Sequence, residues 1–236
     1  MIKNLELLRL MVPANRYATL CNHEMEPVGI VVHNTANTAS AKAEVVNMIN
    51  NNNWRSFHFA VDNVRAVQAI ETNRNAWSAG DGVNGAGNRK YIAVEICYSM
   101  DYKSNFYPQS QDKAAYLIAE LLKSRGWGIE RVKRHYDFSG KDCPHRMLLW
   151  QTINGKYQMN NQTKWLSFLS NIQTYLNELN AIEAKAKAEA EAATTTTTTQ
   201  YVWKVQCGAF KTQEQAQSYA KTLNSKGIAT YVYEEK

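Results

Sequence analysis

Residues 28–35 read VGIVVHNT, a short apolar run that ends in a histidine and two turn-prone residues. An unbroken apolar run of this length is typical of a strand that is buried on both faces of a sheet. His33 stands at the carboxyl end of that run, where functional sites collect in open α/β sheets. The stretch therefore predicts a central strand and one edge of a site.

The segments downstream of this strand alternate in type. Residues 65–70 pair with 57–61 as a predicted hairpin, because Asp62-Asn63 between them is a turn signal. The other predicted elements are a helix over 41–52, a glycine-rich loop over 80–88, a strand over 91–97 and a helix over 111–125. We therefore expect an α/β fold with a mixed central sheet flanked by helices.

Composition excludes several classes of protein. No apolar run reaches the ~18 residues of a membrane helix, so we expect no membrane insertion. Charges interrupt the apolar stretch of residues 1–13, so we expect synthesis in the cytoplasm without a signal peptide. Residues 1–160 hold 19 Lys and Arg against 14 Asp and Glu, which suits either attraction to a polyanion or solubility alone. No arginine-rich stripe indicates a nucleic-acid partner.

A change of composition marks a domain boundary. Residues 181–193 are rich in Ala, Lys and Glu and favour a helix, whereas the six threonines of 194–199 predict an extended flexible spacer. Before them, an apolar stripe from Trp165 to Ile182 predicts a long helix that begins near residue 162. That stripe must be buried on the large domain or on a second copy of the chain. We expect a catalytic domain over 1–160, a helix and linker over 161–199, and a third part over 200–236.

The third part is a small separate βαβ unit by its pattern. Strands are predicted over 201–207 and 228–233, with a helix over 213–225 between them.

The chemistry-bearing residues gather in a few places. Residues 134–145 read RHYDFSGKDCPH, which is a dense set of polar groups for one loop. Glu95 is a carboxylate in an otherwise apolar strand, where burying an unpaired charge is costly, so it is a candidate functional residue. Each has a simpler explanation when taken singly: His33 as a hydrogen-bonded strand end, Glu95 as half of an ion pair, and Cys143 as a packed thiol.

Together these motifs resemble the zinc-dependent type 2 N-acetylmuramoyl-L-alanine amidases, which share a fold with peptidoglycan-recognition proteins and include many phage endolysins. The resemblance spans about residues 25–150. It rests on five blocks in order: VVHNTA from Val31, SFHFAVD from Ser56, AWSAGD from Ala76, GNR from Gly87 through AVEI from Ala93, and His135 through KDCPH.

The resemblance implies a role for each residue. His33, His135 and Cys143 would hold Zn²⁺, Glu95 would be the acid/base, and Lys141 would lie beside the metal. Two imidazoles and one thiolate leave zinc an open position, which is typical of a catalytic site. Candidate substrate contacts are Trp77, His58 and Asn34, and Ser78 departs from the family, whose members usually carry a histidine there.

Residues 200–236 resemble half of a sporulation-related repeat (SPOR) domain, a peptidoglycan-binding module that is normally built from two such halves. The unit is expected to be a wall anchor or, alternatively, a packing appendage. A lone half of this size lacks a core, so we predict a homodimer through residues 200–236.

The sequence therefore predicts a peptidoglycan hydrolase that cleaves the amide between N-acetylmuramic acid and L-alanine of the stem peptide. The expected lack of a signal peptide suits a phage or prophage endolysin, which reaches the cell wall only after its release from the cytoplasm. The alternatives are a non-catalytic peptidoglycan-recognition protein and a thiol hydrolase that uses Cys143 as its nucleophile.

Overall fold

The computed structural model of the chain describes residues 5–153, 156–196, 208–230 and 232. The chain divides into two compact units, Met1–Lys187 and Ala188–Lys236. None of the described helices is both long enough and apolar enough to span a bilayer.

The first unit is built on a six-stranded mixed sheet in the order β1-β4-β3-β5-β2-β6. The expected hairpin is confirmed, because β3 and β4 pair antiparallel. β1 runs parallel to β4, and β3, β5, β2 and β6 are parallel to one another. The strands are β1 (Glu6–Arg9), β2 (Gly29–Asn34), β3 (Phe59–Val61), β4 (Arg65–Gln68), β5 (Tyr91–Ile96) and β6 (Val132–Arg134).

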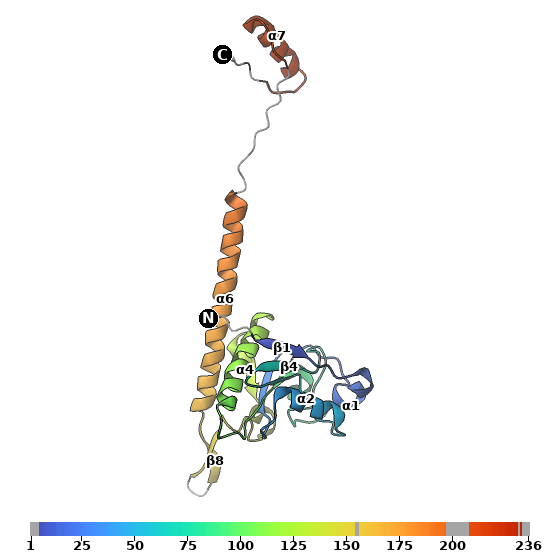
Figure 1. Ribbon diagram of the computed structural model, residues 1–236, viewed down its shortest axis with the longest axis vertical. Helices are drawn as coiled ribbons and strands as arrows, with labels where there is room; N and C mark the ends of the chain where they lie inside the picture. The colour runs from blue at the N-terminus through green and yellow to red at the C-terminus, as the bar shows by residue number, and fades with distance from the viewer. Residues whose placement is uncertain (1–4, 154–155, 197–207, 231, 233–236) are drawn as a thin grey trace. The chain divides into compact units, whose positions relative to one another are not determined.

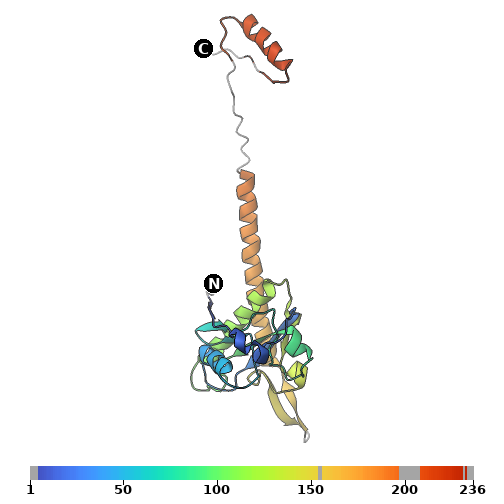
Figure 2. The ribbon, with the colours of Figure 1, turned by 90° about the vertical axis from the view of Figure 1, so that its right-hand side faces the viewer.

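Helices cover both faces of this sheet, as the α/β prediction requires (Figures 1 and 2). α4 (Phe106–Lys123) packs on the face that carries Ile30 and Val32, and α2 (Ala41–Asn50) packs on the face that carries Val31. α4 begins five residues before the predicted start, because Pro108 falls in its first turn, where no backbone N–H is needed. The short helices are η1 (Ala14–Arg16), α1 (Tyr17–Leu20), α3 (Ala86–Lys90), η2 (Ile129–Arg131) and α5 (Tyr136–Ser139).

The long helix α6 (Thr163–Thr196) packs its apolar stripe on the first unit. Tyr175 Oη donates to Asp112 Oδ1 of α4 at 2.6 Å, and Lys123 Nζ lies 3.2 Å from Glu183 Oε2. The buried members of the stripe are Trp165, Phe168, Ile172 and Leu176. The apolar stripe is therefore buried on the chain's own large domain, which was the first of the two expected possibilities.

The threonine tract differs from its prediction. Thr194–Thr196 continue α6 as helix, whereas we expected an extended spacer from residue 194. Extending a formed helix orders one residue for each hydrogen bond gained, so β-branched residues can follow a strong helix. The rest of the tract lies outside the described residues.

Several short elements were not predicted. β1 and β6 have four and three residues, too few to display a period of two. The antiparallel hairpin of β7 (Leu149–Ile153) and β8 (Lys156–Asn161) was also missed.

The second unit contains the expected helix as α7 (Gln213–Asn224), whose N-terminus is capped by the hydroxyl of Thr212. The strand predicted over 201–207 lies outside the described residues, and Ile228–Thr230 have no regular secondary structure. Within residues 208–230 and 232, no side chain is buried. The large apolar side chains Phe210, Tyr219, Ile228 and Val232 are all at least 40% exposed.

Candidate metal centre

Three candidate site residues come from neighbouring parallel strands. His33 is the penultimate residue of β2, and Glu95 lies opposite it in β5. His135 follows β6 directly, and its backbone N–H donates to Val32 O at 3.2 Å. Because the carboxyl ends of β5, β2 and β6 meet at one edge of the sheet, the three side chains lie at that edge.

Cys143 reaches the same edge on the segment that follows α5. Gly140 ends α5 with a φ of 73°, a left-handed conformation that lets the chain turn back. The backbone N–H of Tyr136 then donates to Cys143 O at 3.0 Å, and that of Arg146 donates to Asn34 Oδ1 at 3.0 Å. These two bonds hold the cysteine segment against both histidine-bearing elements.

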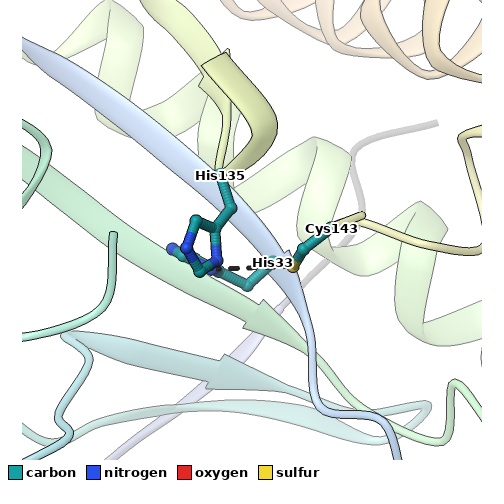
Figure 3. Close-up of side chains that lie close together, drawn as sticks. All are labelled: His33, His135 and Cys143. Atoms are coloured by element: carbon teal, nitrogen blue, oxygen red, sulfur yellow. Dashed lines mark hydrogen bonds between the residues drawn. The ribbon is translucent and has the colours of Figure 1, made fainter. Parts of the chain in front are cut away.

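The geometry of the three side chains fits a tetrahedral metal ion. His33 Nδ1 lies 3.1 Å from His135 Nδ1 and 3.8 Å from Cys143 Sγ (Figure 3). All three candidate ligand atoms lie within 4.8 Å of one another, and all three residues are buried. Tetrahedral zinc, with Zn–N of about 2.05 Å and Zn–S of about 2.3 Å, would place two nitrogens about 3.3 Å apart and nitrogen and sulfur about 3.6 Å apart. The donor set and its spacing thus suit zinc.

The protonation states also suit metal binding. Burial, with the positive charge of Lys141, lowers the pKa of His135 to about 4. Burial and then the neighbouring His135 hold the pKa of His33 well below its usual range. Both imidazoles therefore keep a free lone pair at neutral pH. Burial, followed by the charge of Glu95, raises the pKa of the Cys143 thiol to about 12, so metal binding would have to displace its proton.

Glu95 is a half-buried residue whose carboxyl group has spare hydrogen-bonding capacity. Its Oε2 is shielded from solvent and has no hydrogen-bond partner among the described residues. Burial, together with the negative charge of Glu44 on α2, raises the pKa of Glu95 to about 8, while Lys141 opposes the rise. A carboxyl with this pKa can both accept and release a proton near neutral pH.

Lys141 supplies positive charge to the whole centre. Its side chain is exposed, and its backbone O accepts a hydrogen bond from Cys143 N at 2.7 Å. Its charge lowers the pKa values of His33, Glu95 and Cys143. The expectation that this lysine lies beside the metal ligands is consistent with these couplings.

Two of the candidate substrate contacts have structural partners instead. Asn34 is 6% exposed, and its side chain bridges Tyr107 Oη and the backbone N–H of Arg146. His58 is fully buried in the core. Its Nδ1 accepts from Ala93 N at 2.9 Å, and its Nε2 lies 2.8 Å from Arg74 O, so no ring nitrogen remains for a substrate. The structure does not bring His58 to the metal centre.

Trp77 belongs to an aromatic cluster that the sequence did not reveal. Its ring is 9% exposed and meets the rings of His23 and Trp54 edge-on, at centroid distances of 6.0 Å and 6.4 Å. Trp54 is 57% exposed. Gly80, three residues after Trp77, lies close to His135. A Cβ atom built on Gly80 would be 3.5 Å from His135 Nε2.

Asn88 holds the loop between this cluster and His135. Its Oδ1 accepts from the backbone N–H groups of Ser78 and Ala79 at 2.9 Å and 2.8 Å, and its Nδ2 donates to Gly82 O at 3.0 Å. Its side chain is buried, so these bonds are shielded from water. The sequence marked Asn88 within a motif but gave no indication of this role.

Comparison with known families supports the resemblance seen in the sequence. The N-acetylmuramoyl-L-alanine amidase family matches residues 23–146, and the SPOR domain family matches residues 199–236.

Individual relatives match over the first unit. N-acetylmuramoyl-L-alanine amidase CwlA of Bacillus subtilis is 49% identical over 144 residues, which cover 61% of this chain and 53% of that protein. The chain thus spans about half the length of such curated relatives. The solved structure of PlyL is 40% identical, with a TM-score of 0.63 over 71% of this chain and 97% of that chain. A mutant endolysin from Bacillus subtilis is 31% identical, with a TM-score of 0.59 over 71% and 99%.

Proposed function

Because the chain belongs to the N-acetylmuramoyl-L-alanine amidase family, we propose that it is a zinc-dependent hydrolase of bacterial peptidoglycan. The bond cleaved is the amide between N-acetylmuramic acid and L-alanine of the stem peptide. The observation that carries the proposal is the convergence of His33, His135 and Cys143 near Glu95, whose Oε2 has no hydrogen-bond partner among the described residues. Three protein ligands leave one coordination position open, as catalytic zinc sites do.

The residues divide the chemistry of amide hydrolysis between them. Zinc held by the three ligands would polarise the scissile carbonyl and lower the pKa of a water molecule. Glu95 takes the proton of the attacking water as the new C–O bond forms. It then returns that proton to the alanine nitrogen as the C–N bond breaks.

Lys141 stabilises the charge that develops during this reaction. The carbonyl oxygen becomes negative in the tetrahedral transition state, and a nearby ammonium group favours that state over the neutral amide. Its electrostatic coupling to Glu95, His33 and His135 supports this role.

The two alternative functions are less well supported. A thiol hydrolase needs a thiolate at neutral pH, whereas burial raises the pKa of Cys143 to about 12. A recognition protein without activity would have no use for Glu95 and Lys141 beside a complete ligand set.

Substrate contact is proposed for Trp77 rather than for Asn34 or His58. The ring of Trp77 meets that of the exposed Trp54 edge-on, and indole rings bind the apolar faces of sugars. Asn34 and His58 act by holding backbone segments in place.

The domain organisation is proposed as residues 1–160 for catalysis, 161–199 for connection and 200–236 for wall binding. The match of 199–236 to the SPOR family supports a peptidoglycan-binding role for the last part. Within the connection, the buried stripe of α6 makes its first half a structural part of the catalytic unit.

We further propose that residues 200–236 pair with the same residues of a second chain. The absence of any buried side chain in 208–230 and 232, and the exposure of Phe210 and Tyr219, support an intermolecular partner. The protein would then act at the cell wall as a dimeric endolysin, in keeping with its likeness to an endolysin structure.

Digestion of purified peptidoglycan tests the function. Mass spectrometry should find stem peptides with a new free L-alanine amine and glycan strands that remain intact. New reducing sugar ends, or cleavage within the stem peptide, would contradict the amidase assignment.

A further inference from the structure

Arg146, three residues after Cys143, is held by three separate segments. Its Cζ lies 4.3 Å from the ring centroid of Tyr102 and 4.4 Å from that of Tyr107. Its backbone N–H donates to Asn34 Oδ1 at 3.0 Å, and its Nη1 donates to Ser99 O at 2.9 Å. These contacts give the guanidinium group a defined orientation.

The guanidinium group keeps donors for a ligand from outside. Within the described part of the chain, Ser99 O is its one hydrogen-bond acceptor, and neither Nε nor Nη2 of Arg146 is shielded from solvent. Asp101 couples electrostatically to Arg146, but its carboxylate already accepts from the backbone N–H groups of Lys103 and Ser104 at 3.0 Å each. A fixed guanidinium fork with free donors suits a carboxylate.

The proposed substrate carries a carboxylate close to the scissile bond. The carboxyl group of muramic acid is consumed in the scissile amide, so the negative charge near that bond belongs to the stem peptide. One residue beyond L-alanine, an isoglutamate linked through its side chain leaves its α-carboxylate free, within about 10 Å of the bond. Arg146 follows Cys143 by three residues, so the backbones of the two lie at most about 10 Å apart.

We propose that Arg146 is a specificity-determining residue that pairs with the α-carboxylate of the second stem-peptide residue. The peptide then leaves the metal centre on the side of Tyr102 and Tyr107. This inference rests on the proposed amidase activity and adds a preference for a free carboxylate over its neutral amide.

A pair of substrates that differ in one group tests the pairing. Two disaccharide tetrapeptides are compared, one with D-isoglutamate and one with D-isoglutamine at the second position. The wild-type protein should show a kcat/KM about 10- to 100-fold higher for the acid, the usual value of a charge-assisted hydrogen bond. Arg146→Gln should bring this ratio close to one, and Arg146→Lys should leave a smaller preference because it keeps the charge without the fork.

Arg125→Gln is the matched control. Arg125 also lies over an aromatic ring, 5.4 Å from the centroid of Trp127, and its replacement removes the same charge. It follows the end of α4, whereas Tyr107 is at the start, so the 18-residue helix places them about 27 Å apart. This variant should keep the wild-type preference for the acid.

The outcomes separate this inference from the function on which it rests. Equal wild-type turnover of the two substrates, or an Arg146→Gln variant that is slowed equally on both, would overturn the carboxylate pairing and leave the amidase intact. Cleavage of neither substrate by the zinc-loaded wild type would overturn the amidase itself. If Arg146→Gln fails to fold, the ratio of kcat/KM for the acid to that for the amide, measured in the wild type and in Arg146→Lys, still tests the carboxylate pairing.

Discussion

Glu95 lies directly opposite His33 in the parallel ladder between β5 and β2. The two side chains therefore project from the same face of the sheet at its carboxyl edge. Val31 and Ala93, the paired residues two positions earlier on the same face, lie in the core beneath α2, so the His33–Glu95 pair marks the point where that core becomes a site. A rigid sheet thus sets the separation of a proposed metal ligand and a proposed proton carrier, which loops could not fix so closely.

Replacement of a ligand should remove the metal. The purified wild-type protein should contain about one zinc per chain, and Cys143→Ala should lose both the zinc and the lysis of cell walls, because no fourth residue joins this group in the part of the chain that the structure describes. Cys21→Ala is the matched control, since Cys21 is a fully buried free thiol with no place in the centre. Metal analysis of both variants gives the answer. An active, metal-free Cys143→Ala protein would refute the zinc assignment.

Removal of the proton carrier should separate metal binding from turnover. Glu95→Gln keeps the shape of the side chain but cannot accept the proton of water, so kcat should fall ~100-fold or more while zinc content is unchanged. Turnover of soluble peptidoglycan fragments, measured beside zinc content, distinguishes the two effects. Loss of zinc from Glu95→Gln would instead make Glu95 a ligand.

The sequence, through its resemblance to a known family, named the residues that gather at the candidate metal centre, whereas it did not name the residues that support them. His33 stood out at the carboxyl end of an apolar strand, Glu95 within one, and Cys143 in a dense polar segment, and the family resemblance implied their roles. Arg146 and Asn88 gave no such signal, since their roles depend on hydrogen bonds and ring contacts with segments far away in the sequence. β6 was missed because a three-residue strand has no readable period, although it places His135.

His58 shows that the sequence can also suggest a site role for a residue that the fold uses elsewhere. In the sequence it is one more histidine near a candidate site, and only the fold reveals that both ring nitrogens bind backbone groups, of Ala93 and Arg74. Burial accordingly lowers the pKa of His58 to about 4.

This shift predicts that His58 makes the fold sensitive to acid. The unfolded chain takes up a proton on His58 below a pKa of about 6.5, whereas the folded chain does so only near pH 4. The free energy of unfolding should thus fall as the pH drops from about 6.5 to 4, and its full value should return above that range. For a shift of this size, the loss between pH 7 and pH 5 is about 2 kcal/mol.

His58→Gln provides the comparison. Glutamine can donate to Arg74 O but does not titrate, so the difference in unfolding free energy between wild type and variant should shrink by about 2 kcal/mol from pH 7 to pH 5. Urea denaturation at the two pH values measures it, and the contributions of the other histidines cancel between the two proteins. A difference that does not change with pH would show that His58 titrates normally in the folded protein.

The oligomeric state should depend on the tail and not on α6. Trp165, Phe168, Ile172 and Leu176 are buried against the catalytic unit of their own chain, so this stripe is not free to bind a second copy. The tail, in contrast, has no buried side chain within 208–230 and 232, and an isolated unit of some 37 residues is below the size at which chains usually fold alone. Two tails that pair would each cover the apolar surface of the other and hold two catalytic units on one wall, which raises their local concentration.

Sedimentation of the full-length protein and of a chain that ends at residue 193 tests this arrangement. At micromolar concentration the full-length protein should be a dimer and the shortened chain a monomer. Tyr219→Lys, which places a charge on the exposed apolar face of α7, should also give a monomer without changing the turnover of soluble fragments. A monomer in both chains would refute pairing through the tail. A dimer in both would move the interface to the catalytic unit, against the burial of the α6 stripe.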